Sequence, residues 1–600
     1  APGLALLWAA CGAPDRVARP VEQVEGIIDL LSSAASAAPE TEIDWFTIHR
    51  DTRRAMILPG RVSTAIEVPP QAALTVAFGV DQESWALDAT PIEYQLIAEA
   101  DRRTILWSGR VDPFHDRGDR RWHEREIPLE DWGGRAVRLI WSARGGRAAD
   151  GRQARCGFAV PRIKAPAAAP RADSAGQRLP NLLLYVIDTL RADHLSGYGY
   201  PRPTSPQLDR FMRQGVTFSA VTSPSSWTKT SVASLLTSTY PFVHGANERD
   251  EVLTPLALTL PEWLRRYGYL CAGLVANSNV GAFYGFAQGF DSYRLVLDYE
   301  DETYESVAEV WPLLERWLRA HADERFFLYL HTVDPHVPYR PEEPYRSRFC
   351  RPDGLREFSV ERMIAINEGR LAPSPEELEQ LLDLYDAQIN LTDDYFGRLD
   401  ALLAELGIAP HTIVAVTSDH GEQFLEHGFI THGVDLFREE IQVPLMVRYP
   451  GRIEPGTRVA ARTQLLDLMP TLLELAGVPI PARLDGRSMA ALLQSSGAGA
   501  PEQNPTDVYA ELRLDGRHAR TLLRGRHKLM AYPDQAQTWL YDLLADPAEQ
   551  HPIANGAVWS ELNAAMQRLR RSRPRLDPEP QRRELDPEQL RLLKALGYAR

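Results

Sequence analysis

Residues 182–187 read Leu-Leu-Leu-Tyr-Val-Ile, and Asp188 follows them directly. An unbroken apolar run of this length is expected of a strand that is buried on both faces of a parallel sheet. Two more runs, Phe-Phe-Leu-Tyr-Leu at 326–330 and Ile-Val-Ala-Val at 413–416, have the same character. The alternation of such runs with amphipathic segments predicts an α/β domain, in which a mostly parallel central sheet carries helices on both faces. The amphipathic segments lie at 256–266, 304–320 and 376–406.

Polar residues follow each of the three apolar runs. They are Asp188, the segment from His331 to His336, and the pair Asp419 and His420. In open α/β sheets, ligands bind beyond the carboxyl ends of the strands. We therefore expect the three polar clusters to converge on one site.

The chain before the α/β domain has a different pattern. Between residues 41 and 165, short stretches alternate apolar and polar residues, as in Leu-Thr-Val-Ala-Phe at 74–78. Gly, Pro and Asp separate these stretches, which predicts an all-β sandwich domain. Residues 166–180 are rich in Ala and Pro, as is typical of a linker. The second domain is then expected at 181–575, with a C-terminal tail at 576–600.

The first 40 residues are expected to hold a trimmed leader and a short helix at 20–37, where apolar residues cluster on one face. Leu-Ala-Leu-Leu-Trp-Ala-Ala-Cys at 4–11 is typical of the end of an export signal, with Cys11 in a lipoprotein cleavage box. A short apolar tail or a buried first helix is the alternative. The favoured interpretation predicts an exported protein, periplasmic or at the cell surface, with a lipid anchor at Cys11.

Composition excludes some functions and leaves others open. The net charge of −15 and the pI of about 5.6 argue against a nucleic-acid partner, which requires a basic face. A small anionic substrate stays open, because a bound cation can reverse the field inside one pocket. The four cysteines include no CxxC pair, so no structural zinc site is expected. Four tryptophans either pack in the first domain, which we favour, or form a sugar platform: Trp85, Trp107, Trp122 and Trp132.

Four segments of the second domain carry motifs. They read VIDTLRADHL at 186–195, WTKTSVASLLT at 227–237, HTVDPHVPY at 331–339 and VTSDHGE at 416–422. Together and in this order they resemble the sulfatase family of the alkaline phosphatase-like superfamily. The resemblance extends over about residues 180–550. It implies a metal-dependent ester hydrolase.

The resemblance also implies a set of metal ligands. Asp188, Asp419 and His420 would bind one divalent cation, for which Mg²⁺, Mn²⁺, Zn²⁺ and Ca²⁺ are all open. A second ion stays open, because an ester formed on threonine must be cleaved by an activated water, which two-metal sites supply. Asp334 is the ligand that we assign to that second site.

The position of the nucleophile departs from the family pattern. Alignment of Ala233–Thr237 places Thr228 where sulfatases carry the cysteine that becomes formylglycine. A hydroxyl at the start of a helix, bound to a divalent cation, can attack a phosphate or sulfate ester. The alternative role of Thr228 is that of a helix cap. His336 is expected to contact the ester group or to protonate the leaving oxygen.

Three residues are assigned to substrate binding: Lys229, Asn277 and His432. The last two fall near positions where sulfatases carry a lysine. We therefore expect a hydrolase that uses Thr228 on a small anionic ester or on a sulfated or phosphorylated glycan. Phosphate esters are favoured on chemical grounds, and sulfate esters remain open. A non-catalytic protein that binds a glycan or another anion is the alternative function.

Overall fold

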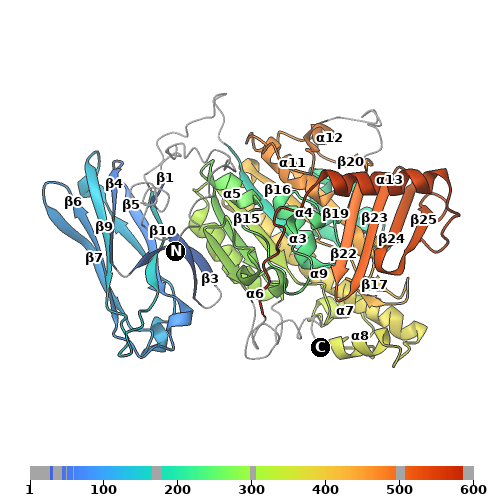
Figure 1. Ribbon diagram of the computed structural model, residues 1–600, viewed down its shortest axis with the longest axis horizontal. Helices are drawn as coiled ribbons and strands as arrows, with labels where there is room; N and C mark the ends of the chain where they lie inside the picture. Colours follow the sequence, from blue (N-terminus) through green and yellow to red (C-terminus); the bar gives the residue numbers. More distant parts are fainter. Residues whose placement is uncertain are drawn as a thin grey trace, which may run out of the picture. The chain divides into compact units, whose positions relative to one another are not determined.

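Figure 1 shows the computed structural model of the chain. It describes residues 27–30, 43–48, 51–58, 60–164, 179–296, 306–494 and 507–584. Two compact units are present, one of Ala1–Asp44 with Ala55–Arg171 and one of Trp45–Arg54 with Ala172–Arg600. The expected leader with Cys11, most of the linker and most of the C-terminal tail lie outside the described residues.

The larger unit is built on a mostly parallel sheet, with the strand order β20-β12-β19-β16-β11-β15-β13-β14. Strand β11 pairs in parallel with both β15 and β16, so that Tyr185 lies between Leu330 and Val416. Strand β19 is antiparallel to β16 and to β12, and β12 therefore runs in the same direction as β11. The predicted α/β class is confirmed. The bounds are β11 Asn181–Ile187, β12 Val216–Thr222, β13 Leu270–Val275, β14 Ser292–Leu295, β15 Phe326–Thr332, β16 Thr412–Thr417, β19 Gln442–Arg448 and β20 Thr457–Val459.

Strand β11 shows why the apolar run forms a central strand. Leu183, Tyr185 and Ile187 belong to one buried cluster, whereas the alternate residues of the same strand belong to another. Because successive side chains of a strand point to opposite faces, both faces of the sheet are covered. Helices α2, α6 and α9 contribute to the first cluster, and α3, α5 and α11 to the second.

The helices that cover the sheet differ in length, as Figure 1 shows. The longest is α9, which begins with a capping box between Ser374 and Glu377. It occupies the third predicted amphipathic segment, α6 the second, and α5 only the middle of the first. The bounds are α2 Pro206–Gln214, α3 Thr228–Thr237, α4 Pro241–His244, α5 Leu260–Arg265, α6 Val307–His321, α7 Tyr345–Phe349, α8 Val360–Asn367, α9 Pro375–Glu405, α10 Arg438–Ile441, α11 Leu468–Leu475, α12 Ala490–Gln494 and α13 Ala557–Ser572.

A second, antiparallel sheet follows in the C-terminal part of the larger unit. It has the order β22-β23-β24-β25, and helix α13 packs on it (Figure 1). Tyr509, Leu529 and Leu562 share one buried cluster across this contact. The bounds are β22 Val508–Leu514, β23 Arg517–Arg524, β24 His527–Tyr532 and β25 Gln537–Asp542.

The smaller unit consists of antiparallel strands around one core. One sheet has the order β4-β9-β6-β7, and the other joins β1, the second half of β3, β10, β5 and β8. Trp141 of the first sheet and Phe158 of the second pack edge to face, with ring centroids 5.1 Å apart. The bounds are β1 Ile27–Asp29, β3 Asp51–Leu58, β4 Gly60–Glu67, β5 Ala73–Val80, β6 Ile92–Glu99, β7 Arg103–Val111, β8 His123–Pro128, β9 Ala136–Arg144 and β10 Cys156–Lys164.

One prediction for this part of the chain is wrong. Ile27–Asp29 forms strand β1, where a helix was expected over 20–37. The cause is tertiary, because β1 pairs with residues 162–164 at the end of β10. Trp132 is buried in the core, and Trp85 and Trp107 pack against it, as favoured above. Within the described ranges no helix is both long and apolar enough to cross a membrane.

Candidate active site and metal centre

Two carboxylates and two imidazoles meet where the parallel strands end. Asp188 follows β11, Asp419 lies just beyond β16, and His331 is the next-to-last residue of β15. His331 Nε2 lies 3.8 Å from Asp188 Oδ2 and 4.0 Å from Asp419 Oδ2. Asp188, Asp419 and His420 form a group whose ligand atoms all lie within 4.8 Å of one another. The predicted convergence of three strand ends is therefore seen in the structure.

The turn after β11 holds Asp188 in place. Thr189 has a φ of 55°, in the left-handed region that a β-branched residue rarely enters. The Tyr385 hydroxyl donates to Thr189 O over 2.7 Å, and Ser418 Oγ accepts from Leu190 N over 2.9 Å. These contacts support a strained backbone at the site, as is common where a functional group must be positioned.

The Thr228 hydroxyl lies against this group. His420 donates from Nδ1 to Gly421 O over 2.9 Å, which leaves Nε2 as the nitrogen with a lone pair. That Nε2 lies 3.1 Å from Thr228 Oγ1 and 3.4 Å from Asp419 Oδ2. All three side chains are fully buried. The hydroxyl, an imidazole and a carboxylate thus share one enclosed space.

Helix α3 begins at Thr228 without a side-chain cap. Its N-cap residue is Trp227, whose side chain makes no cap hydrogen bond, and Thr228 is the first residue of the helix itself, so Thr228 does not act as the helix cap. Ser231 Oγ donates to Asp419 O over 2.7 Å and ties the first turn of the helix to the end of β16. The main-chain N–H groups of an uncapped helix start are a favourable place for an anion.

Three polar atoms in the group have no hydrogen-bond partner among the described residues: Asp188 Oδ1, Asp419 Oδ2 and His331 Nε2. Buried polar atoms are rarely left in this state, because the loss of water costs about 1–3 kcal/mol for each atom. His331 Nε2 lies 4.0 Å from Asp419 Oδ2, and His420 Nε2 lies 3.7 Å from Asp188 Oδ1. Both separations exceed hydrogen-bond length and fall within the roughly 4.2 Å that can separate two atoms ligating one ion at roughly 2.1 Å. The donors present therefore fit a divalent cation.

The pKa values of these groups are shifted by their burial and by the charges of their neighbours. Burial and the facing Asp419 carboxylate raise the pKa of Asp188 well above its usual value. Burial works to raise the pKa of Asp419, but the neighbouring His420 and His331 lower it. Burial lowers the pKa of His331 to about 4, which keeps its ring neutral. A divalent cation between the carboxyl groups would allow both to ionise.

His331 is the residue that sequence reasoning missed. It was seen only as the start of a polar segment, and the roles in that segment were given to Asp334 and His336. Its position at the end of a buried apolar run was the available signal. Its Nδ1 lies 2.9 Å from the Tyr329 hydroxyl, which orients the ring toward the carboxylates.

Asn277 is hydrogen-bonded to Asp188, although it was predicted to contact the substrate. Its amide donates to Asp188 Oδ2 over 2.6 Å, and its oxygen accepts from Asn279 N over 2.8 Å. Asn277 lies two residues beyond the end of β13, and β13 is the strand that pairs with β15. The side chain thus orients a carboxylate of the metal group.

His432 and His336 line up beside His420. The ring centroids of His432 and His420 are 4.3 Å apart, and those of His336 and His432 are 4.9 Å apart. His432 Nδ1 lies 3.0 Å from Glu422 Oε1, and the Tyr339 hydroxyl donates to the other oxygen of Glu422 over 3.2 Å. Burial raises the pKa of Glu422 to about 7, and burial with His432 lowers that of His336 to about 3. Glu422 had no predicted role, although it closes the VTSDHGE motif.

Lys229 does not face the site, contrary to its prediction as a substrate ligand. Its ammonium group donates to the carbonyl oxygens of Glu248, Arg249 and Glu251, at 3.4, 2.6 and 3.2 Å. An ammonium group has three N–H donors, so all of them are used. It also lies 3.3 Å from the centre of the Tyr284 ring. Lys229 therefore fastens the loop at 248–251.

Asp334 lies outside the metal group, and its predicted place in a second metal site stays a prediction that its hydrogen bonds do not favour. Its Oδ2 accepts from Val307 N over 2.8 Å, and its Oδ1 accepts from Gln388 Nε2 over 3.2 Å. Both oxygens are thus occupied at the start of α6.

Comparisons with known proteins agree with the fold. The sulfatase family matches residues 180–478, and the C-terminal family of N-sulphoglucosamine sulphohydrolase matches 426–574. Arylsulfatase K of Mus musculus is 34% identical over 187 residues, which are 30% of this chain and 33% of that protein. The matched part thus spans about a third of the length of this relative.

Solved structures share the fold. A structure in complex with D-glucosamine-2-N,6-O-disulfate has a TM-score of 0.58 and 19% identity, and covers 68% of this chain and all of its own. The phosphonate monoester hydrolase of Agrobacterium radiobacter has a TM-score of 0.54 and 20% identity, with 66% and 95% covered. The two family matches overlap and together span residues 180–574, and the chain belongs to the sulfatase family of the alkaline phosphatase-like superfamily.

Proposed function

We propose that the chain is a metal-dependent hydrolase that cleaves a sulfate or phosphate ester with Thr228 as its nucleophile. The observation that carries this proposal is the 3.1 Å contact of Thr228 Oγ1 with His420 Nε2, beside buried carboxylate oxygens that have no hydrogen-bond partner in the described part of the chain. The uncapped start of α3 supports it, because its main-chain N–H groups can receive the anionic part of an ester.

Asp188, Asp419 and His420 would hold the cation, and His331 would be a fourth ligand. Two carboxylates with two imidazoles suit Zn²⁺ or Mn²⁺ better than Ca²⁺, which takes about six to eight oxygen ligands. A divalent cation polarises an ester and favours the ionised form of a bound hydroxyl. In the described part of the chain no other cluster of three such ligands was found, so we propose one ion.

The first chemical step replaces one ester by another. Thr228 Oγ forms a bond to sulfur or phosphorus, and the bond from that atom to the oxygen of the substrate alcohol breaks. The leaving oxygen gains the proton that Thr228 loses. His432 is the carrier that we propose, because its Nδ1 is hydrogen-bonded to Glu422 and its ring lies against that of His420.

The second step releases the acid and restores the threonine. His336 donates from Nδ1 to Val337 O over 2.5 Å, so its Nε2 is the nitrogen that can accept a proton. A water that attacks the threonine ester can pass a proton to this nitrogen. The bond to Thr228 Oγ then breaks, and Thr228 recovers its hydroxyl proton.

Similar proteins indicate which substrates to test first. The structure in complex with D-glucosamine-2-N,6-O-disulfate points to a sulfated amino sugar, and the phosphonate monoester hydrolase to a small phosphonate or phosphate monoester. Both substrate classes contain a negatively charged tetrahedral group, centred on sulfur or phosphorus, that is bonded to the ester oxygen. We propose a sulfated sugar as the substrate class, with phosphate and phosphonate esters as the comparison.

Initial rates with p-nitrophenyl sulfate, p-nitrophenyl phosphate and bis-p-nitrophenyl phosphate test the proposal. They are measured after chelation and after addition of Zn²⁺, Mn²⁺, Mg²⁺ or Ca²⁺ in turn. Thr228→Ala is expected to lower kcat by about 10³-fold or more, because the nucleophile is removed. Thr230→Ala is the matched control, since its buried hydroxyl donates to Ala246 O and lies outside the group. A Thr228→Ala variant with the wild-type rate would refute the proposal.

Non-catalytic binding of a glycan or another anion is the second candidate. The orientation of Lys229 favours it, because this amine is bound to main-chain carbonyls and contributes nothing to an ester site. Titration calorimetry with glucosamine 6-sulfate separates the two functions. Heat of binding without turnover under every metal supports the binding protein.

A further inference from the structure

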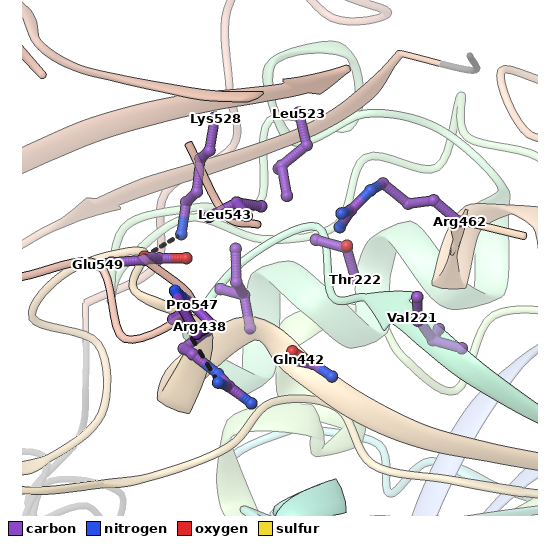
Figure 2. A pocket seen from close by; sticks show the side chains of 12 residues that line it. Val221, Thr222, Arg438, Gln442, Arg462, Leu523, Lys528, Leu543, Pro547 and Glu549 are labelled. Atoms are coloured by element: carbon purple, nitrogen blue, oxygen red, sulfur yellow. Dashed lines mark hydrogen bonds and ion pairs between the residues drawn. The ribbon is translucent and has the colours of Figure 1, made fainter. Parts of the chain in front are cut away.

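A cavity of about 270 Å³ lies in the larger unit, and none of its lining residues belongs to the metal group. Thr222 ends β12 and Gln442 begins β19, so this wall lies at the edge where β11 and β16 end. Figure 2 shows Leu523 and Lys528, from the C-terminal sheet, on another wall. The lining carries three positively charged side chains, Arg438, Arg462 and Lys528, and one carboxylate, Glu549.

One of these charges is already neutralised. Lys528 Nζ lies 2.7 Å from Glu549 Oε2 and donates to Leu436 O over the same distance (Figure 2). Both charged groups are buried, with exposed side-chain fractions of 1% and 2%. The pair therefore holds the wall together and leaves the net charge of the cavity to the remaining residues.

The two remaining charges are arginines that donate hydrogen bonds to main-chain carbonyl oxygens. Arg438 Nη1 donates to Pro547 O over 3.1 Å, and Arg462 Nη2 donates to Gly525 O over 3.5 Å. In the ranges that the structure describes, neither guanidinium has a carboxylate within 4.0 Å. Burial lowers the pKa of Arg462, while the charge of the Glu549 carboxylate raises it. In Figure 2 its guanidinium group extends toward Thr222.

We infer that this cavity binds a tetrahedral oxyanion, a sulfate or phosphate group, between Arg438 and Arg462. A guanidinium presents paired N–H donors that match two oxygens of such a group. Thr222 and Gln442 add neutral donors to the same wall. The volume falls below the range of about 300–1,000 Å³ typical of pockets for larger ligands, so it suits one small charged group. A local basic site is needed in a chain with a net charge of −15, which repels anions elsewhere.

Titration calorimetry with sodium sulfate and sodium phosphate, at constant ionic strength in chloride, tests the inference. The protein is the full chain after chelation, and also its Thr228→Ala variant, so that the result does not depend on the catalytic proposal. We expect one oxyanion per chain in both. Arg462→Met and Arg438→Met should each weaken binding by about tenfold or more. Arg316→Met, which removes an exposed arginine of α6, should leave affinity unchanged.

Two results would overturn the inference. One is undiminished binding in both Arg462→Met and Arg438→Met, with the fold of each checked by its thermal midpoint. The other is loss of all oxyanion binding on chelation, which would assign the anion to the metal group. Glucosamine 6-sulfate is a second probe, and it distinguishes a site for an ester-linked sulfate group from a site for the free anion. Tighter binding than inorganic sulfate indicates an ester-linked group, and equal or weaker binding indicates the free anion.

Discussion

At the scale of single residues, the direction of a few buried side chains decides which chemistry the site can perform. His331 points its Nε2 at two carboxylates, whereas Lys229 points its amine at three carbonyls of a loop. Both are buried polar groups, and each makes hydrogen bonds inside the protein, as buried polar groups generally do. His331 alone is left with an atom to give to a ligand.

His331→Ala is expected to weaken metal binding by at least about tenfold, because it removes one proposed ligand and uncovers the carboxylates. Metal content after dialysis against buffered Zn²⁺ and Mn²⁺ measures the change without reference to activity. His194→Gln serves as the control, since that buried ring is bonded to Asp386 and lies outside the group. Equal metal content in His331→Ala and the wild type would remove His331 from the ligand set.

His244 makes stability depend on pH. Its Nδ1 accepts from Ala246 N, and burial with the nearby Arg575 lowers its pKa to about 3 from 6.5. The unfolded chain therefore takes up the proton first, and stability falls as the pH drops below 6.5. At pH 5 the loss amounts to roughly 2 kcal/mol. The difference between the denaturant midpoints at pH 7 and 5 should become smaller in His244→Asn, because other buried groups still contribute to it, and should stay that of the wild type in His411→Asn, an exposed control.

At the scale of elements, the starts of helices α6 and α3 differ in whether side chains cap their first N–H groups. The first N–H groups of any helix lack partners within it. Helix α6 satisfies them with Ser306 and Asp334. Helix α3 leaves them without a side-chain cap beside Thr228. The capped helix contributes to stability, and the uncapped one is suited to receive an anion.

Asp334→Ala is expected to destabilise the protein by about 0.5–2 kcal/mol, because α6 loses an acceptor at its start. Metal content should stay that of the wild type, since both oxygens of Asp334 are bonded to Val307 and Gln388. Thermal unfolding and elemental analysis of one preparation measure the two quantities. Loss of a metal ion from this variant would restore Asp334 to a second metal site.

At the scale of the whole molecule, the chain divides into two compact units, and every residue of the metal group belongs to the larger one. A cation that binds only the folded state stabilises it by mass action, by about 2.7 kcal/mol at a concentration 100 times the Kd. The stabilisation should therefore be confined to the unit that holds the ligands.

Differential scanning calorimetry with and without chelator tests this confinement. We expect two transitions, of which chelation lowers only the one that belongs to the larger unit. The assignment of each transition follows from Asp419→Asn, which should abolish the shift. If chelation moved both transitions equally, the two units would unfold as one, and this prediction would be wrong.

Much of the fold and part of the site follow from the sequence alone. The run at 182–187 predicted a strand buried on both faces, because only such a strand needs apolar residues at consecutive positions. The motifs then placed Asp188, Asp419, His420 and Thr228 near one another, and the distances agree. These residues lie within three positions of a strand end or a helix start, where the local backbone determines the direction of the side chain.

Only the tertiary structure decided the roles of His331, Asn277, Lys229 and Asp334, and the strand at Ile27–Asp29. Each depends on a segment distant in the sequence: Asn277 on Asp188, Asp334 on the start of α6, and β1 on the end of β10. Sequence patterns report burial and local geometry. They do not report which of several polar partners a buried group meets, because that is settled when the elements pack and every donor must find an acceptor.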